Sequence, residues 1–433
     1  MNLSRSARAL GQWLLLGAIV GGVCGVASAV FLALLEEATA FRLAHESLVY
    51  ALPVAGLVVG AVYGRWGASI RGGNNLVLDT VHVGDAVIPL RMAPMVLLGT
   101  VLTHLFGGSA GREGTAVQMG ASLADQIAWR FRVTPDTRRE LLAAGIAGGF
   151  GSVFGTPLAG TVFGLEVVCV GRLGYEALLP ALTAAVVGDL VTRGLGIHHT
   201  AYPSPQVLAL TLPVLGRWLV FAVGIAGVAV AFIEGTHGLK RVLERRVPWL
   251  PVRMALGGLG VVGLWKLAGT SDYLGLGVPG ILRAFEDASL PWGAFAWKLV
   301  FTVVTLGAGF LGGEVTPLFF IGAALGNVLA RLLGLPVDLG AAVGMAALFA
   351  AAANTPLALS LMAVELVGAS VLPHVAIVAT VAYLLTGHRG IYPSQRIARR
   401  KLGGPLLDRV VALRELHAAP PKPPAPPASR TDA

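Results

Sequence analysis

Long apolar runs constrain the fold of this chain more than any other feature. The runs cover residues 12–35, 47–63, 93–106, 177–193, 206–233, 252–268, 298–311 and 338–385. Several reach the roughly 20 residues that a helix needs to cross a bilayer, and others are shorter. Only 13% of the residues are charged, about half of the roughly 25% that is usual in a soluble domain. The sequence therefore predicts an all-α polytopic membrane protein embedded in a lipid bilayer.

Basic residues flank the first and the last apolar run. Arg5 and Arg8 precede the first run, and the last is followed by Arg396, Arg399, Arg400 and Lys401. Basic residues mark the cytoplasmic ends of membrane segments. We therefore expect a multi-pass protein of the cell inner (plasma) membrane with both termini in the cytoplasm. The net charge of +9 is split between two membrane edges and has no nucleic-acid motif beside it, so no nucleic-acid partner is expected.

The two ends of the chain predict different structures. The N-terminal stretch imitates a signal peptide, but its apolar part runs on to Leu35, which favours an uncleaved first helix. Residues 403–433 end in the proline-rich AAPPKPPAPPASRTDA, which predicts a cytoplasmic disordered tail. The two cysteines and the histidines have no metal-ligand spacing, so we expect no metal or cofactor and place these histidines on the surface or in loops: His82, His104, His198, His199 and His388.

The two halves of the chain repeat one another. GIAGGFGSVFGTPLAGTVFGLE at 145–166 matches GMAALFAAAANTPLALSLMAVE at 344–365 in eight of 22 positions, with an offset of 199 residues. Upstream, an offset of 202 pairs GGNNLV at 72–77 with LGLGVP, and GREGT at 111–115 with GEVTP at 313–317. We divide the chain into a first membrane half, residues 1–205, and a second, residues 206–402. Repeated halves are typical of transporters, whose substrates bind where the halves meet.

Glycine-rich breaks stand at equivalent places in the two halves. They lie at 72–76, 107–115, 274–280 and 307–317. A helix that begins at such a break presents unpaired N–H groups and the positive end of its dipole, which together stabilise an anion. The breaks therefore predict an anion site at membrane depth.

At these breaks the sequence resembles the CLC family of chloride channels and anion/proton antiporters. The family signature reads GSGIP, G(K/R)EGP, GxFxP and a late tyrosine, and the matching segments here are GNNLV at 73–77, GREGT at 111–115, GEVTP at 313–317 and Tyr392. The resemblance spans roughly residues 10–402, in the right order. It implies a CLC-type inverted repeat of many short tilted helices and a homodimer with one pathway in each subunit.

The departures from the signature indicate a particular branch of the family. GNNL together with GREGT looks like the fluoride-exporting branch, and Val167 stands where chloride/proton members carry an inner glutamate. The resemblance therefore implies a proton-coupled fluoride exporter (a fluoride/proton antiporter) that binds fluoride and protons. The alternative is a chloride/proton antiporter or chloride channel of the same fold. An intramembrane enzyme is not expected, because the chain has no HExxH, GxSxG or paired Cys/His motif.

Glu113 is the predicted anion/proton gate. Its carboxylate is an anion tethered at a helix start: ionised, it blocks the anion site, and protonated, it leaves the site to a mobile anion. Adjacent residues on a helix point in different directions, so an ion pair between Arg112 and Glu113 is not expected. The family resemblance implies that a set of residues at these breaks contacts the anion. They are Gly73, Asn74, Asn75, Gly114, Thr115, Val315, Thr316 and Tyr392. Without the resemblance, the asparagines would be turn formers, the threonines helix caps and Tyr392 an interfacial aromatic.

Two further glutamates close equivalent helices. Glu166 is a candidate for the proton path, because intramembrane acids are functional candidates by default. The alternative is that Glu166 and Glu365 lie at helix ends in water or pair with Arg172 or Arg389. Glu314 is an acid beside the predicted anion site; the alternatives for it are to bind a cation or to pair with a basic group, and the sequence does not decide between them.

Overall fold

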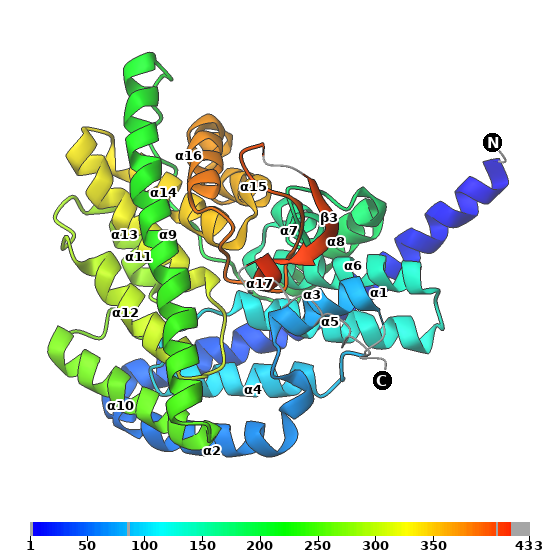
Figure 1. The fold of residues 1–433 in the computed structure, drawn as a ribbon, viewed down its shortest axis with the longest axis horizontal. Helices are drawn as coiled ribbons and strands as arrows, with labels where there is room; N and C mark the ends of the chain where they lie inside the picture. Colours follow the sequence, from blue (N-terminus) through cyan, green and yellow to red (C-terminus); the bar gives the residue numbers. More distant parts are fainter. Residues whose placement is uncertain (1–2, 85–86, 404–405, 417–433) are drawn as a thin grey trace, which may run out of the picture.

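The computed structural model describes residues 3–84, 87–403 and 406–416, and most of them are helical. Each half contributes eight α-helices, at varied tilts (Figure 1). The first half contains α1 (Leu3–Ala44), α2 (Leu52–Trp66), α3 (Asn74–Val83), α4 (Met92–Leu105), α5 (Glu113–Arg130), α6 (Pro135–Phe154), α7 (Pro157–Glu166) and α8 (Leu178–Gly194). The second contains α9 (Leu212–Arg246), α10 (Leu250–Ala268), α11 (Val278–Glu286), α12 (Ala294–Gly307), α13 (Val315–Leu333), α14 (Val337–Ala353), α15 (Pro356–Val367) and α16 (Leu372–Leu385).

In the described part of the chain, six helical stretches are long and apolar enough to cross a membrane. They are Ala7–Ala44, Glu46–Trp66, Tyr175–Gly194, Leu212–Arg246, Leu250–Ala268 and Val315–Leu333. The chain also has shorter apolar helices, such as α4, α12 and α14. The prediction of a multi-pass all-α membrane protein is therefore confirmed. The stretch that imitates a signal peptide lies within the single helix α1.

A two-fold axis relates the two halves, and two sets of reciprocal contacts lie across it. The backbone N–H of Gly111 donates to the carbonyl oxygen of Gly313 over 2.6 Å, and the N–H of Gly313 donates to the carbonyl oxygen of Gly111 over 2.7 Å. The two residues are equivalent in the repeat and form an antiparallel bridge. Equivalent residues exchange the same bond in both directions here, as expected when a local two-fold axis relates the two repeats.

The second reciprocal contact joins α7 and α15. Glu166, at the end of α7, accepts hydrogen bonds from the N–H groups of Leu357 and Ala358, at 3.1 and 2.8 Å. Glu365 of α15 accepts from the N–H groups of Leu158 and Ala159, at 2.9 and 2.7 Å. Each helix therefore ends in the carboxylate that caps the start of its counterpart. A carboxylate at a helix start satisfies free N–H groups and complements the dipole.

Small residues set the spacing between the innermost helices. A Cβ atom on Gly120 of α5 would press on the backbone of Gly145 in α6, and the same holds for Gly322 of α13 against Gly344 in α14. Both pairs are equivalent in the repeat. Close backbone approach of this kind is how membrane helices pack without large apolar side chains.

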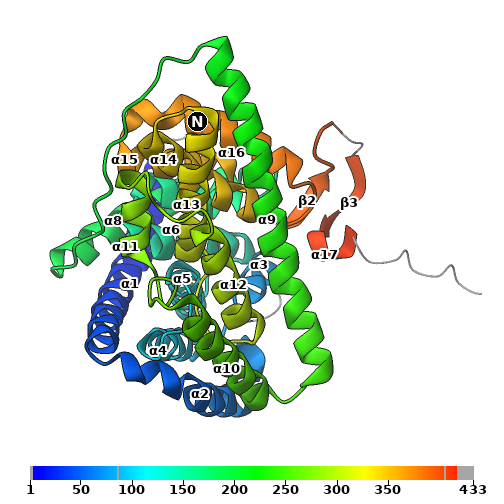
Figure 2. The same ribbon diagram turned by 90° about the vertical axis from the view of Figure 1, so that its left-hand side faces the viewer.

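A small sheet, not expected from the sequence, closes the C-terminal end. Strands β1 (Cys169–Val170) and β2 (Arg396–Arg399) are parallel, and β3 (Leu406–Ala412) runs antiparallel to β2 before the short helix α17 (Leu413–Leu416) (Figure 2). The prediction of a disordered tail is therefore wrong for residues 406–416, because β3 finds a ladder partner and Leu413 is buried beside Ile397. The remainder of that tail, 404–405 and 417–433, lies outside the described residues.

Candidate functional site

The predicted breaks coincide with the starts of four short or central helices. α3 begins at Asn74 after Gly73, which has a φ of 54°, and α5 begins at Glu113. In the second half α11 begins at Val278 and α13 at Val315. The positive φ at Gly73 is a backbone conformation that favours glycine. The Gly111–Gly313 bridge brings the starts of α5 and α13 together at the two-fold axis.

The carboxylate of Glu113 lies against the start of α13. Its side chain is fully buried, and Oε2 accepts from the backbone N–H of Thr316 over 3.1 Å. The Thr316 hydroxyl donates to Oε1, and the N–H of Arg112 donates to Oε2 over 3.0 Å. The carboxylate oxygens thus stand where a free anion would meet the same donors. A titratable group therefore occupies donors that an anion could also use.

The prediction that Arg112 and Glu113 do not pair is wrong. The Nε atom of Arg112 lies 3.6 Å from Oε1 of Glu113. Arg112 caps α5 instead of belonging to it, so the directions that helical residues take do not apply to this pair. The guanidinium therefore contributes positive charge directly beside the gate carboxylate.

The asparagine block lies on the other side of Gly114. The Nδ2 atom of Asn74 would be 3.0 Å from a Cβ atom on Gly114, so glycine is needed there. The Oδ1 atom of Asn74 is buried and has no hydrogen-bond partner among the described residues. Asn75 is occupied differently: its Oδ1 accepts from the N–H of Ser394 over 3.0 Å. The amide oxygen is therefore unpaired in Asn74 and hydrogen-bonded in Asn75.

The remaining predicted residues divide into chamber-lining and packing positions. A chamber of about 230 Å³ is lined by Gly73, Asn74, Asn75, Thr115, Glu314 and Tyr392, among others. We call it the inner chamber. The Thr115 hydroxyl is also hydrogen-bonded to that of Thr100 over 2.7 Å. Val315 is buried in the core and contributes to the site only as the first residue of α13.

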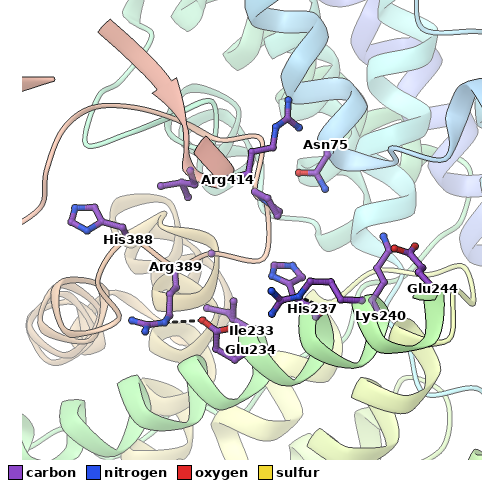
Figure 3. Close-up of a pocket in the computed structure, with 13 residues that line it drawn as sticks. Asn75, Ile233, Glu234, His237, Lys240, Glu244, His388, Arg389 and Arg414 are labelled. Atoms are coloured by element: carbon purple, nitrogen blue, oxygen red, sulfur yellow. Dashed lines mark hydrogen bonds and ion pairs between the residues drawn. The ribbon is translucent and has the colours of Figure 1, made fainter. Parts of the chain in front are cut away.

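A second, basic cavity adjoins the inner chamber. This vestibule, of about 470 Å³, lies between the second half of α9 and two short segments, 388–393 and 413–414 (Figure 3). It shares Asn75, His237, Lys240 and Glu244 with the inner chamber. Its basic lining residues are His237, Lys240, Arg241, His388, Arg389 and Arg414. A cavity lined mainly by one sign of charge raises the local concentration of the opposite ion.

These vestibule residues and Gln118 were not predicted from the sequence. Gln118 of α5 lines the inner chamber, with its amide 3.5 Å from the Cβ position of Gly73. A usable signal was present on α9, where His237, Lys240, Arg241 and Glu244 follow the i, i+3, i+4, i+7 spacing of one helix face. Gln118 lies on α5 beyond the signature block, and no pattern marked it.

Glu166 and Glu365 cap helices instead of pairing with Arg172 or Arg389. The Nε atom of Arg389 is 2.9 Å from Oε1 of Glu234. Glu314 lines the inner chamber, and its Oε2 atom is buried with no hydrogen-bond partner among the described residues.

His104 departs from the expected surface position. It is buried, and its ring nitrogens lie 2.8 and 2.9 Å from the carbonyl oxygens of Thr100 and Ala110. Within the described ranges, no three His, Cys, Asp or Glu side chains form a group that could hold a metal ion.

Comparison with known proteins identifies the family. The family described as voltage gated chloride channel matches residues 55–387. The chain belongs to the CLC family. A CLC relative from Pseudomonas syringae pv. tomato, named chloride/fluoride channel protein, is 46% identical over 422 residues, or 94% of this chain and 92% of the relative. The voltage-gated ClC-type chloride channel ClcB of Salmonella typhi is 32% identical over 319 residues, or 68% of this chain and 73% of that protein.

Solved CLC structures share the fold. A CLC-type fluoride/proton antiporter matches with a TM-score of 0.87 and 38% identity, covering 90% of this chain and 98% of that one. A slow cyanobacterial Cl⁻/H⁺ antiporter matches with a TM-score of 0.75 and 20% identity, covering 86% and 94% of the two chains. At that identity the second match speaks for the CLC fold alone. The predicted CLC-type inverted repeat is confirmed.

Proposed function

We propose that this CLC protein is a proton-coupled fluoride exporter, which exchanges fluoride for protons across the membrane. The observation that carries the proposal is the position of Glu113, whose carboxylate accepts the Thr316 N–H and hydroxyl at the start of α13. One group there can hold either a proton or the place of an anion. The family and the relatives named for fluoride support the same function.

The coupling follows from competition for one set of donors. Ionised Glu113 satisfies the donors at the start of α13 and excludes a mobile anion. Protonation removes the charge that the helix start stabilises, so the side chain leaves and an anion takes its place. When the anion departs, the carboxylate must lose its proton before it binds the donors again. Anion and proton therefore move in opposite directions.

Fluoride is favoured over chloride by the donors around the inner chamber. Fluoride is small and strongly hydrated, so it must exchange water for several short N–H and O–H contacts. Asn74 and Asn75 each carry an NH₂ group, and a GSGIP block would have a hydroxyl and a bare glycine in their place. We assign anion contacts to these two residues, to Tyr392, to Gly73, to Gly114 and Thr115, and to the start of α13 at Val315 and Thr316.

The finer assignments follow the family and the charge pattern. We propose a homodimer with one pathway in each subunit, placed in the plasma membrane with both termini in the cytoplasm. Transport, and not an enzymatic reaction, is the activity that the paired helix starts support. Glu166 stays a weaker candidate for the proton path, because its carboxylate is already occupied by two N–H groups of α15.

Flux measurements in liposomes test this function directly. The purified protein is reconstituted with the same fluoride concentration inside and outside, and efflux is followed with a fluoride electrode, with and without a pH gradient. We expect an inward proton gradient to drive fluoride out against its own gradient, and chloride to move much more slowly. Equal chloride and fluoride rates would replace the assignment by the chloride/proton antiporter or chloride channel of the same fold.

A further inference from the structure

We infer that Arg414 is a positioning residue for the anion path, which acts through the side-chain amide of Asn75. The inference rests on the proposed function, because it assigns a specificity role to the same asparagine block. It brings the C-terminal segment, whose last part was not expected to be ordered, into the transport site.

The first step concerns the orientation of the Asn75 amide. The backbone N–H of Ser394 meets Oδ1 of Asn75 at 3.0 Å. A backbone N–H can only donate, so the oxygen of the amide must face Ser394 and the NH₂ group must face away from it. Asn75 lines both the inner chamber and the vestibule. The bond from Ser394 therefore turns the donor end of the amide toward the anion path.

The second step concerns what holds Ser394. Its side chain is fully buried, and its hydroxyl donates to Oδ2 of Asp79 over 3.0 Å while accepting from Nη1 of Arg414 over 2.7 Å. The two terminal nitrogens of Arg414 also reach the two oxygens of Asp79, each at 3.1 Å. This is the two-bond fork by which arginine fixes a carboxylate in direction as well as distance.

The third step connects the network to two contact residues at once. Asp79 follows Asn75 by four residues on α3, so both lie on one face of that helix. Ser394 is therefore hydrogen-bonded to α3 at two positions one helical turn apart, Asn75 and Asp79. The N–H of Arg414 also donates to the carbonyl oxygen of Pro393 over 3.0 Å, next to Tyr392. Arg414 thus fixes the position of the Tyr392 loop relative to α3, although the two are about 315 residues apart in the chain. In Figure 3, Asn75 and Arg414 lie across the vestibule from His237 and Lys240.

The ion pair between Arg414 and Asp79 is partly exposed to water, so its effect on the site can be told apart from an effect on folding stability. The side chains of Arg414 and Asp79 are 49% and 29% exposed. An ion pair so accessible to water contributes little to folding stability. Its loss should therefore change how Asn75 and Tyr392 are held much more than it changes unfolding.

The test compares five full-length proteins reconstituted in liposomes: wild type, R414Q, R414K, D79N and R283Q. For each we measure the apparent KM for fluoride, the fluoride/chloride flux ratio and the melting temperature in detergent. We expect R414Q and D79N to raise the KM and lower the ratio, each by about three- to tenfold, since part of one hydrogen bond to a charged ion is lost. R283Q is the matched control: it breaks an ion pair of similar exposure, between Arg283 and Asp272, that lines neither cavity, and it should behave as wild type.

Two comparisons separate positioning from simple attraction of the anion by charge. R414Q removes a positive charge and D79N a negative one, so an effect of charge alone would shift the KM in opposite directions, whereas positioning shifts both upward. R414K keeps the charge but not the fork, so positioning predicts only partial rescue. Opposite shifts, full rescue by R414K, or an unchanged KM and ratio in R414Q would each overturn the inference. A wild type without fluoride preference overturns the proposed function instead; Arg414 is then judged by the KM of the transported anion, by the same criteria.

Discussion

At the scale of single residues, the start of α13 accounts for most of the chemistry. Glu113 is held by donors that any bound anion would use, and Arg112 adds positive charge at 3.6 Å. The donors come from the second half of the chain, whereas the carboxylate comes from the first. The proposed gate would therefore operate across the junction of the halves.

Replacing Glu113 with glutamine should abolish proton coupling without unfolding the protein. Glutamine keeps the shape of the protonated side chain but can neither release a proton nor compete as an anion. We expect E113Q to remain monodisperse in detergent and to lose pH-driven fluoride accumulation in liposomes, with passive flux retained or lost. Undiminished proton-driven transport by E113Q would remove Glu113 from the mechanism.

Replacing Thr316 with valine should weaken anion binding. Valine keeps the branched shape but loses the hydroxyl that donates to the Glu113 carboxylate. One hydrogen bond to a charged group is worth about 1.5–3 kcal/mol, or roughly a ten- to hundredfold change in affinity. The apparent KM for fluoride measures this, and T316S, which keeps the hydroxyl, is the control. A T316V protein with the wild-type KM would show that the backbone N–H alone binds the anion.

At the scale of helices, α7 and α15 are tied together by their own ends. Both oxygens of Glu166 and of Glu365 are occupied by N–H groups at the start of the other helix. Such bonds are charge-assisted and stronger than neutral ones. The repeat made the two glutamates recognisable as equivalents. Their partners depend on how two helices from different halves cross, which spacing along the chain does not contain.

E166Q and E365Q should therefore behave alike. Each removes the charge from one cap, so we expect each to cost about 1–3 kcal/mol of stability and to lower the melting temperature by a similar amount. Proton coupling should survive in both, with E365Q as the matched control for E166Q. Complete loss of coupling in E166Q alone, with anion flux retained, would restore Glu166 to the proton path.

At the scale of the whole molecule, the net charge is +9, and basic side chains are concentrated in the lining of the vestibule. Charges of the exposed basic side chains there are screened by salt over about 10 Å at 0.1 M. Capture of fluoride at low concentration should thus depend on ionic strength.

Raising the salt concentration with an impermeant anion should slow fluoride entry severalfold when fluoride is scarce and leave the maximal rate unchanged. K240Q, which removes a charge shared by both cavities, should show a lower rate and a weaker salt dependence. R245Q alters a basic residue of the last turn of α9 that lines neither cavity and serves as control. An identical salt dependence in wild type and K240Q would exclude Lys240 from anion capture.

Features that depend on neighbouring residues in the chain could be predicted from the sequence, and contacts between distant residues could not. The breaks at Gly73, Gly111 and Gly313 were predictable, because glycine-flanked segments and duplicated blocks are patterns along the chain. The contact of Asn75 with Ser394 joins residues far apart in sequence and required the folded structure. Strand β3 was missed because the proline-rich residues beyond it dominated the composition of that end, whereas pairing with β2 decided its structure.

The bridge between Gly111 and Gly313 has a consequence for the origin of the protein. The Gly111–Gly313 bridge and the paired caps of α7 and α15 are reciprocal, so a chain of half this length could make the same contacts with a second copy of itself. Those two copies would face opposite sides of the bilayer. Such an ancestor must have inserted in both orientations, and fusion of its gene with a duplicate would have fixed one orientation for each half.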